Sequence, residues 1–438
     1  MTGTGRARWL VLVTMCAGYF LVLLDVTVVN VALPAVQAGT GAGVAGLQWV
    51  VDGYAVALAA LLLAAGALGD LRGHRRIVLL GLGLFGAASL ACGLAPGVGV
   101  LVAARAVQGV GAALLLPGTL AIISRTFPEE GERARAIGVW AGVGSLALPA
   151  GPLVGGALVD AWGWRWVFLL NVPIVLLAAA VTLRAVPGEE GRPGTRVDYA
   201  GAVLAAVALA AATFAIVAGA PAVAVVAVAA WVAFVWIEAR STEPMLPLGL
   251  FRRRTFAVAN LAAGLMNFGT LGLLFLLTLF LQSVQHRSAL AAGAALLPLF
   301  LPLAVLAPLA GRVVARTGPR PAIVAGLAVA AVGVALLATW EADTPYPRLF
   351  PAMLAWGVGL GLLTPGVVTA AIGALPADRS GLASGVNNTA RQAGGAMGIA
   401  VYGAVAGRQF LTGLHATGLV TAGLFAAMAV AVWGLRAG

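Results

Sequence analysis

The stretch GALGDLRGHRR, from Gly66 to Arg76, lies between two long apolar runs and reads as a tight, charged turn at a membrane surface. A second turn of this kind, GRVVARTGPRP from Gly311 to Pro321, lies in the other half of the chain. Two related turns at matched places predict an internally duplicated membrane protein. That architecture is typical of secondary transporters.

Composition makes lipid the solvent for most of this chain. Hydrophobic residues form 61% of the sequence and charged residues only 9%, whereas soluble domains have roughly half and a quarter. The net charge is +11, but the arginines are scattered between apolar runs, so we expect no nucleic-acid partner. The sequence has no glycine-rich phosphate loop, and its histidines and cysteines lack metal-ligand spacing. We therefore predict a protein that is not an enzyme and has no cofactor or metal.

Apolar runs of about 20 residues, the length of a spanning helix, predict an all-α integral membrane protein with fourteen transmembrane helices. The runs begin near Trp9, Leu47, Ile77, Val98, Arg135, Arg165, Val197, Val223, Thr255, Ala289, Arg320, Leu349, Gly381 and Leu414. The two longest polar connections bracket the seventh and eighth runs. We therefore predict a six-helix half over 1–190, an inserted helix pair over 191–240, and a second six-helix half over 241–438.

The distribution of arginine predicts the orientation in the membrane. If the amino terminus is inside, the cytoplasmic connections carry most arginines, and the opposite connections hold only Arg165, Arg287, Arg348 and Arg408. Positively charged loops are retained in the cytoplasm, so both termini are expected inside. The abundance of Ala, Gly and Arg without Lys indicates a GC-rich genome, and we expect the cytoplasmic membrane of a bacterium.

Six segments, taken in order, resemble motifs of the major facilitator superfamily, specifically its fourteen-helix drug/proton antiporter branch. They are LDVTVVNVALP (24–34), GALGDLRGHRR (66–76), RAVQGVGAALLLPG (105–118), GSLALPAGPLVGG (144–156), WGWRWVFLLNVPI (162–174) and GLASGVNNTARQAGGAMG (381–398). The resemblance covers nearly the whole chain and implies two pseudo-symmetric halves that rock around a central site. Two positions depart from the pattern: Leu71 stands where a basic residue often follows the motif Asp, and Ala315 takes the acidic position of the second turn.

Asp25 is the outstanding candidate for chemistry. It lies inside the first apolar run, where a charged side chain costs at least about 2.5–3.5 kcal/mol, so a role in proton coupling or substrate binding is expected. Arg105 lies about 10 Å inward along its own run at 1.5 Å per residue, a depth similar to that of Asp25. We predict that Arg105 holds the deprotonated Asp25 and that protonation releases it. A purely structural ion pair is the alternative.

Several other polar side chains in the apolar runs are candidate substrate contacts. Asn387, Asn388, Arg391 and Gln392 form a polar patch in one run, and Asn260 and Asn267 share a helix face because they are seven residues apart. Interhelical hydrogen bonding is an equal alternative for both groups. Asp52 is expected at the outer end of its helix, beside Trp49 and Tyr54, which fit an interfacial aromatic belt. The predicted substrate contacts are Asp25, Asn30, Asp52, Gln108, Asn260, Asn267, Asn388 and Arg391.

Glycines, a proline and surface charges form the predicted gates. The resemblance implies that Gly151, Pro152, Gly155 and Gly156 seal the cavity against proton leak, and ordinary tight packing is the alternative. It also implies that Asp70 and Arg75 latch the cytoplasmic ends of the two halves, with Arg133 or Arg135 completing the latch. The predicted gating set is Gly66, Asp70, Gly73, Arg75, Gly151, Pro152, Gly155 and Gly156.

The resemblance thus implies a proton-coupled antiporter that exports lipophilic small molecules, drugs or antibiotics, by alternating access. Its expected partners are the substrate, protons and membrane lipid, and no oligomeric state is predicted. A dedicated exporter of one endogenous metabolite or self-made antibiotic is the alternative. A proton-coupled importer is disfavoured by the resemblance in segment 144–156 and by the scarcity of embedded hydrogen-bonding residues.

Overall fold

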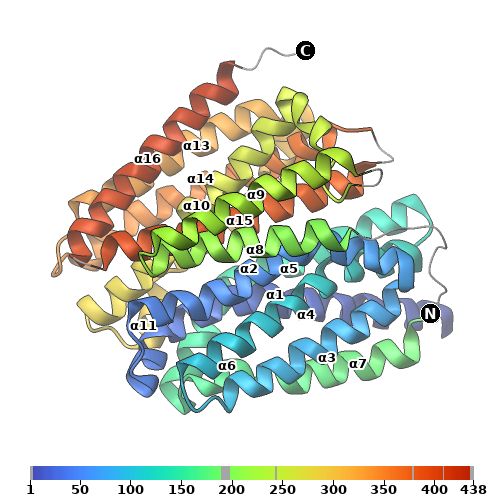
Figure 1. The fold of residues 1–438 in the computed structure, drawn as a ribbon, viewed down its shortest axis with the longest axis horizontal. Coiled ribbons are helices and arrows are strands. Elements are labelled where there is room, and N and C mark those ends of the chain that lie inside the picture. Colours follow the sequence, from blue (N-terminus) through green and yellow to red (C-terminus); the bar gives the residue numbers. More distant parts are fainter. Residues whose placement is uncertain (1–2, 189–197, 242–243, 377–378, 408, 435–438) are drawn as a thin grey trace. The chain divides into compact units, whose positions relative to one another are not determined.

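The computed structural model describes residues 3–188, 198–241, 244–376, 379–407 and 409–434, and every regular element in these ranges is a helix (Figure 1). The elements are α1 (Gly3–Thr40), α2 (Val44–Arg72), α3 (His74–Gly93), α4 (Val98–Thr126), α5 (Glu130–Trp162), α6 (Arg165–Leu169), α7 (Asn171–Ala185), α8 (Tyr199–Val217), α9 (Pro221–Arg240), η1 (Leu248–Arg252), α10 (Arg254–Leu279), η2 (Phe280–Val284), α11 (Ala289–Ala295), α12 (Leu297–Thr317), α13 (Pro319–Ala335), η3 (Leu336–Thr339), α14 (Tyr346–Gly373), α15 (Ser380–Ala406) and α16 (Phe410–Gly434). The predicted all-α membrane fold is confirmed.

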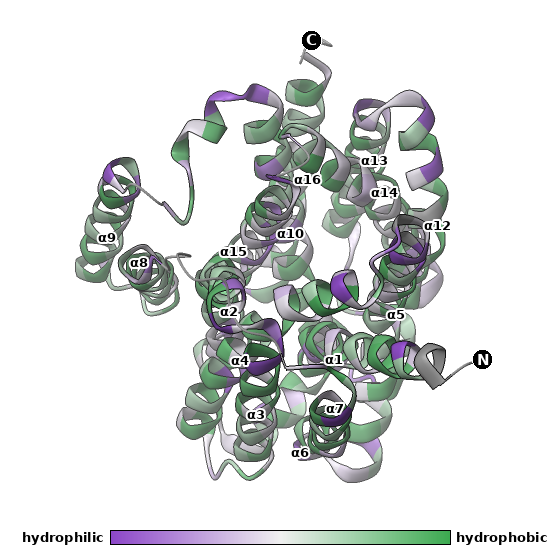
Figure 2. Cartoon of the chain, turned by 90° about the vertical axis from the view of Figure 1, so that its right-hand side faces the viewer, coloured by the Kyte–Doolittle hydropathy of each residue, from purple (hydrophilic) through white to green (hydrophobic). Residues whose placement is uncertain are grey.

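Helices are the expected answer to an apolar solvent, because a helix satisfies its own backbone hydrogen bonds where no water is present. Apolar residues cover the helices along most of their length, and hydrophilic residues gather near helix ends and in connections (Figure 2). Prolines lie inside several helices, among them Pro117 in α4 and Pro365 in α14. Neighbouring helices make such prolines tolerable in a membrane.

The number of spans is close to the prediction. Within the described ranges, twelve helices are long and apolar enough to cross a membrane, and the bent pair α11–α12, with a 43° bend, makes thirteen. The fourteenth candidate, α15, forms a helix of 27 residues at the expected place but falls outside that set. Its central Asn387, Asn388, Arg391 and Gln392 reduce its apolar character.

The helices form two compact units. Unit 1 comprises Met1–Val207 and Arg240–Met245, and unit 2 comprises Ala208–Ala239 and Leu246–Gly438. The division between them along the chain lies inside α8. The predicted boundary at 190–191 lies outside the described residues, so the organisation into six, two and six helices stays a prediction.

Each unit packs its helices with the same set of neighbours. In unit 1, α4 packs against α2 and α3, while α1 packs against α4, α5 and α7. In unit 2, α14 packs against α12 and α13, while α10 packs against α14, α15 and α16. The two halves are therefore copies of one helical arrangement, as the matched turns predicted.

Glycines at the helix crossings show which residue of one half corresponds to which residue of the other half. An added β-carbon on Gly111 of α4 would lie 2.9 Å from the carbonyl oxygen of Gly81 in α3. One on Gly359 of α14 would lie 2.6 Å from the carbonyl oxygen of Gly326 in α13. The same spacing pairs Val78 with Ile323, Pro117 with Pro365 and Gly118 with Gly366. Each residue of α3 and α4 thus has a defined counterpart in α13 and α14.

The two turns that mark the duplication also share a backbone conformation. Gly73 between α2 and α3 has φ 88°, and Gly318 between α12 and α13 has φ 80°. This left-handed region is favourable only for glycine, because a β-carbon would clash with the backbone. Gly73 is therefore required by the geometry of the turn itself.

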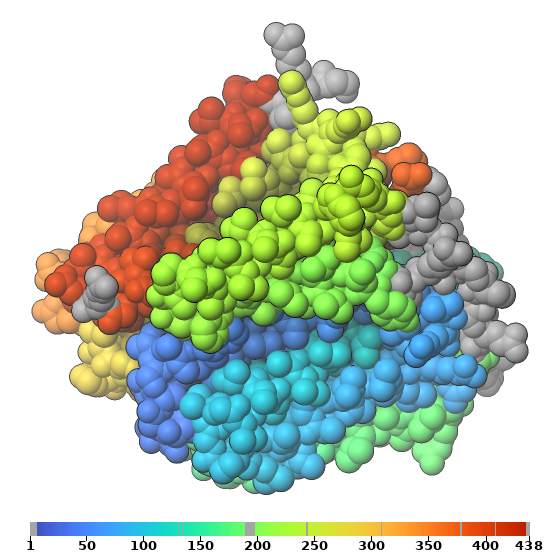
Figure 3. Space-filling model, in the orientation of Figure 1, coloured from blue at the N-terminus to red at the C-terminus, as the bar shows by residue number. Residues whose placement is uncertain are grey.

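The helix pair α8 and α9 presents apolar side chains outward. The two helices follow one another along the chain (Figures 1 and 2), and the atoms of α9 lie at the surface that faces the viewer in the space-filling view (Figure 3). Val225, Val228 and Val232 on one face of α9 are more than 60% exposed. Such a face is stable in lipid and costly in water.

Candidate functional site

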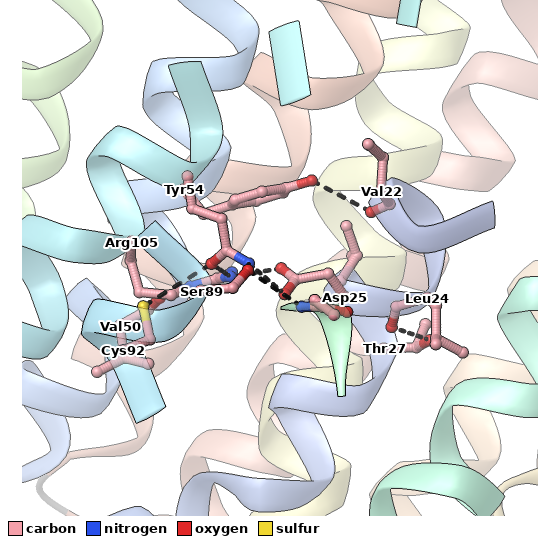
Figure 4. A network of polar contacts seen from close by, with 12 residues as sticks. Val22, Leu24, Asp25, Thr27, Val50, Tyr54, Ser89, Cys92 and Arg105 are labelled. Carbon is pink, nitrogen blue, oxygen red and sulfur yellow. Dashed lines mark hydrogen bonds and ion pairs between the residues drawn. The ribbon is translucent and has the colours of Figure 1, made fainter. Parts of the chain in front are cut away.

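Asp25 and Arg105 meet in the interior of unit 1. Nη1 of Arg105 donates a hydrogen bond to Oδ2 of Asp25, which joins the middle of α1 to α4 (Figure 4). Asp25 is 2% exposed and Arg105 is fully buried. The structure thus brings together the two residues that the sequence paired by depth.

Gln108, one helical turn after Arg105, contacts both members of the pair. Its Oε1 accepts from Nη1 of Arg105 at 2.7 Å, and its Nε2 donates to Oδ1 of Asp25 at 3.0 Å. Nε2 also donates to Oγ of Ser89 on α3 at 2.9 Å, and Nδ2 of Asn171 on α7 lies 3.4 Å from the same hydroxyl. All five side chains are buried. A polar network drawn from four helices therefore lies inside an apolar unit.

The rest of the Arg105 side chain is held by α2. Its Nε donates to the carbonyl oxygen of Val50 at 2.9 Å, and its guanidinium carbon lies 4.3 Å from the centre of the Tyr54 ring. The Tyr54 hydroxyl in turn donates to the carbonyl oxygen of Val22 on α1 at 3.1 Å (Figure 4). Tyr54 is 1% exposed, so its assignment to an interfacial belt is wrong.

Small residues allow the helices around this network to pack closely enough to exclude water. A β-carbon on Gly109 of α4 would clash with the carbonyl oxygen of Tyr54, and one on Gly151 of α5 would clash with Thr27 of α1. One on Gly155 would lie 3.2 Å from the Cα of Val28. The glycines of segment 144–156 thus press α5 against α1 next to Asp25.

The charge balance of the site explains why it can be buried. An unpaired charge in an apolar interior is prohibitively costly, but Asp25 and Arg105 neutralise each other. Both carboxylate oxygens of Asp25 accept from N–H donors. The observed arrangement therefore suits the deprotonated form of Asp25.

Two predicted substrate contacts in unit 1 have polar atoms without a partner in the described part of the chain. Asp52 is fully buried in the third turn of α2, and neither of its carboxylate oxygens makes a hydrogen bond. Asn30 donates to the carbonyl oxygen of Val26 at 2.6 Å, but its own Oδ1 has no donor. The sequence placed Asp52 at an outer helix end, whereas the structure buries it as completely as Arg105.

In unit 2, the predicted contacts are only partly brought together. Nδ2 of Asn387 on α15 donates to Oδ1 of Asn260 on α10 at 3.3 Å, and both residues are buried. Asn267, Asn388 and Arg391 are each half-buried, and Arg391 is not without a partner. The Asn260–Asn387 bond is an interhelical hydrogen bond of the kind that stabilises membrane helices.

The charged turn between α2 and α3 is anchored within unit 1. Asp70 Oδ1 lies 3.3 Å from Nε2 of His74, and Nη2 of Arg75 donates to the carbonyl oxygen of Leu183 at the end of α7 at 2.6 Å. Gly66 packs towards Pro117 of α4 at 3.8 Å, measured from an added β-carbon. Pro152 and Gly156 are buried in α5. The predicted latch between the halves stays a prediction.

Ser89, Asn171 and Tyr54 belong to the network but were not predicted as site residues. Ser89 and Asn171 are single polar residues in apolar runs, and each is almost completely buried. A search for isolated polar residues at the depth of Asp25 would have found them. The contact of Tyr54 with Arg105 depends on how α2 turns around its axis, which its sequence does not reveal.

The register between the halves gives four residues of the site a counterpart in unit 2. Met353 stands at the position of Arg105, Trp356 at that of Gln108, and Val334 at that of Ser89. Leu299, whose carbonyl faces Gly357 as that of Tyr54 faces Gly109, replaces the tyrosine. All four are buried apolar or aromatic residues. The counterparts of Arg105, Gln108, Ser89 and Tyr54 therefore cannot form the same polar contacts in unit 2.

A family model described as Major Facilitator Superfamily matches residues 15–399. The chain belongs to this superfamily. This superfamily consists of membrane transporters. The protein is therefore a multi-pass transporter of small substrates and not an enzyme.

Several curated relatives are named for resistance to drugs or antibiotics. The chain is 38% identical over 410 residues to "Multidrug resistance protein Stp" of Mycobacterium tuberculosis, covering 91% of this chain and 76% of that one. It is 40% identical over 418 residues to "Puromycin resistance protein pur8" of Streptomyces alboniger, with 92% and 82% covered. It is 36% identical over 418 residues to "Tetracenomycin C resistance and export protein" of Streptomyces glaucescens, with 92% and 76% covered.

Solved structures show the same fold. The human organic anion transporter MFSD10 aligns with a TM-score of 0.68 at 18% identity, covering 97% of this chain and 99% of that one. A bacterial homologue of the human drug peptide transporters PepT1 and PepT2 aligns with a TM-score of 0.69 at 15% identity, covering 97% of each chain. At this identity, the likeness establishes the fold alone.

Proposed function

We propose that the protein is a proton-coupled antiporter that exports lipophilic small molecules, drugs or antibiotics, across the cytoplasmic membrane of a bacterium. The observation that carries the proposal is the buried network of Asp25, Arg105 and Gln108. It holds a titratable acid in a dry interior at high cost, and such acids in membrane segments mark proton or substrate pathways. Relatives named for resistance to multiple drugs, to puromycin and to tetracenomycin C support the substrate class.

The network supplies a simple coupling step. With Asp25 deprotonated, Arg105 and Gln108 hold α1 and α4 together. A proton that enters from outside binds the carboxylate, removes its negative charge and weakens the hold of Arg105. Binding of substrate from the cytoplasm favours release of that proton inward. Alternating access then exchanges one species for the other, because a ligand shifts a conformational equilibrium only by binding one state better.

We assign substrate recognition first to buried polar atoms that make no hydrogen bond within the described structure. The Asp52 carboxylate and the Asn30 carbonyl oxygen can accept hydrogen bonds, and Asp52 can balance a cationic drug. In unit 2, the half-buried Asn267, Asn388 and Arg391 are the proposed contacts. The remaining surroundings are apolar, as a lipophilic substrate requires.

Orientation and gating complete the proposal. Retention of the arginine-rich connections in the cytoplasm places both termini inside. The turn with Asp70 and Arg75 is then cytoplasmic, and we assign it the gating role that the family resemblance implies. Gly151 and Gly155 keep α5 against α1 and so limit proton leak past Asp25.

A dedicated exporter of one antibiotic is the second candidate, because two of the relatives are named for a single compound. A panel of chemically unrelated drugs, tested for resistance in a host without its own efflux pumps, separates the two functions. Resistance to several classes supports a multidrug exporter. Resistance to one compound alone supports the dedicated exporter.

The central test is Asp25→Asn in inverted membrane vesicles. We expect wild-type vesicles with an imposed pH gradient to show proton movement on addition of a transported drug, and Asp25→Asn to abolish it, because the amide keeps the shape but cannot titrate. Cationic drugs should lose more transport than neutral ones. Asp343→Asn, which changes an exposed acid, is the matched control. Full proton-coupled transport by Asp25→Asn would disprove the assignment and move attention to Asp52.

A further inference from the structure

The orientation of the Gln108 side-chain amide is determined by its neighbours. Arg105 has only donors, so the atom of Gln108 that faces it must be Oε1. The NH₂ group therefore faces Asp25 and Ser89, and its two hydrogens are both used. This orientation requires an acceptor at Oδ1 of Asp25, and Arg105 requires another at Oδ2. A deprotonated carboxylate meets both requirements.

A proton on Asp25 creates a conflict at this amide. Oδ2 faces Arg105 and Oδ1 faces the NH₂ group of Gln108, so a carboxyl O–H on either oxygen points at a donor. A half-turn of the Gln108 amide removes the conflict at Asp25, because Oε1 then accepts from the protonated carboxyl, and it turns the NH₂ group towards Arg105, which has only donors and must move away. The same half-turn takes away from Arg105 the acceptor at 2.7 Å.

Ser89 is the residue type that supports both orientations. A hydroxyl both donates and accepts, so Ser89 accepts from the Gln108 NH₂ group in the observed state and can donate to its Oε1 after a half-turn. Asn171 contacts the same hydroxyl from α7. An apolar residue at position 89 could serve neither state, and unit 2 has Val334 there, opposite Trp356.

We propose that the Gln108 amide is a two-position switch that reads the protonation of Asp25 and frees Arg105, with Ser89 and Asn171 as its support. Gln108 is thus a positioning residue, and its predicted role as a substrate contact is replaced. The inference rests on the proposed proton coupling. In the described structure Arg105 from α4 is hydrogen-bonded to Asp25, and Tyr54 from α2 and Cys92 from α3 are close enough to feel its charge. The approaching part of α5 presents Gly151.

Cys92 provides a native reporter of this switch. Its Sγ donates to Oε1 of Gln108 at 3.9 Å in the observed state. After a half-turn it would face the NH₂ group and lose its acceptor. The S–H stretching band lies in an uncrowded part of the infrared spectrum and moves to higher frequency when the hydrogen bond is lost. Only Cys16 and Cys92 are present in the chain, so Cys16→Ala leaves a single thiol band.

The experiment is an infrared pH titration of the full-length Cys16→Ala protein in lipid, without any drug. We expect the Asp25 carboxyl band, identified by its absence in Asp25→Asn, and the Cys92 thiol band to change together. In Gln108→Leu the carboxyl band should still titrate, and the thiol band should lose its pH dependence completely. Ser89→Ala leaves the amide in place. Both bands should still change with pH, but they should no longer change over the same pH range.

A thiol band that stays constant while Asp25 titrates in the Cys16→Ala protein would overturn the switch, as would an unchanged thiol response in Gln108→Leu. The proposed function fails in a different way. If the Asp25 carboxyl band and the Cys92 thiol band change together with pH but no drug moves protons in vesicles, the switch stands and drug–proton exchange does not. If drugs move protons but the thiol band does not change with pH, only the switch is wrong.

Discussion

At the scale of single residues, the ion pair of Asp25 and Arg105 is more important for charge balance than for cohesion. Taking two charges out of water costs several kcal/mol each, and their attraction in a dry interior only repays this. Removing one partner is therefore far more damaging than removing both. This asymmetry separates the energetic role of the pair from its role in coupling.

Arg105→Met should destabilise the protein by about 3–5 kcal/mol at neutral pH, because it leaves an uncompensated carboxylate in the interior. The double variant Asp25→Leu with Arg105→Met should recover most of this loss, yet show no proton coupling. Thermal unfolding of the purified protein in detergent measures the first effect, and vesicle transport measures the second. Equal stability of Arg105→Met and the unaltered protein would show that the pair carries no buried charge.

Prediction from the sequence succeeded for some single residues of the site and failed for others. Asp25 and Arg105 could be found because charge is rare inside apolar runs and depth can be counted along a helix. Tyr54 could not be assigned, because its contact with Arg105 depends on the rotation of α2 against α4. Asp52 looked peripheral for the same reason. Position along a helix can be read from a sequence more easily than the direction of a side chain.

At the scale of helices, glycine decides which elements can touch. α4 lies between α2 and α3, with Gly109 against the carbonyl of Tyr54 and Gly111 within 2.7 Å of the backbone nitrogen of Phe85, measured from an added β-carbon. These contacts set the position of Arg105 and Gln108 between them. The elements themselves were predictable from apolar length, α15 included, although its polar centre leaves this helix of 27 residues outside the set of clearly apolar spans.

Gly109→Ala should destabilise the protein by about 1–3 kcal/mol, because the added methyl group forces α2 away from α4. Gly99→Ala on the same helix is the matched control, since an added β-carbon there meets nothing within 4 Å. The control should be neutral or slightly stabilising, because alanine is the better helix former. Thermal unfolding of both variants side by side gives the comparison. A Gly109→Ala protein as stable as its control would contradict the packing argument.

At the scale of the whole molecule, the two halves share an arrangement of helices but differ in chemistry. Both copies have the same helix neighbours and the same glycine-bearing turn. Their duplication was predictable from the matched turns. The confinement of the polar network to unit 1 was not, because it emerges only when contacts define which residues of α4 and α14 correspond.

The helix pair α8–α9 should be peripheral to transport. Its outward faces are apolar, and its buried acid, Glu238, lies near the end of α9 and accepts from the backbone nitrogen of Leu246 at 3.0 Å. Deleting Val197–Glu238 and rejoining the chain with a short linker should leave measurable drug export. Size-exclusion chromatography checks that the shortened protein folds. A well-folded protein without any export would show that the pair is needed.

The one-sided polar network also has a consequence for biogenesis. α1 leaves the ribosome with Asp25 long before α4 supplies Arg105, so the first helix must enter the bilayer with an acid that has no partner. On insertion scales this costs about 2.5–3.5 kcal/mol. The counterparts of the network in α12, α13 and α14 are apolar and incur no such cost. Assembly of the amino-terminal half is therefore cooperative across the four helices of the network, whereas α12, α13 and α14 can enter the membrane without such a partner.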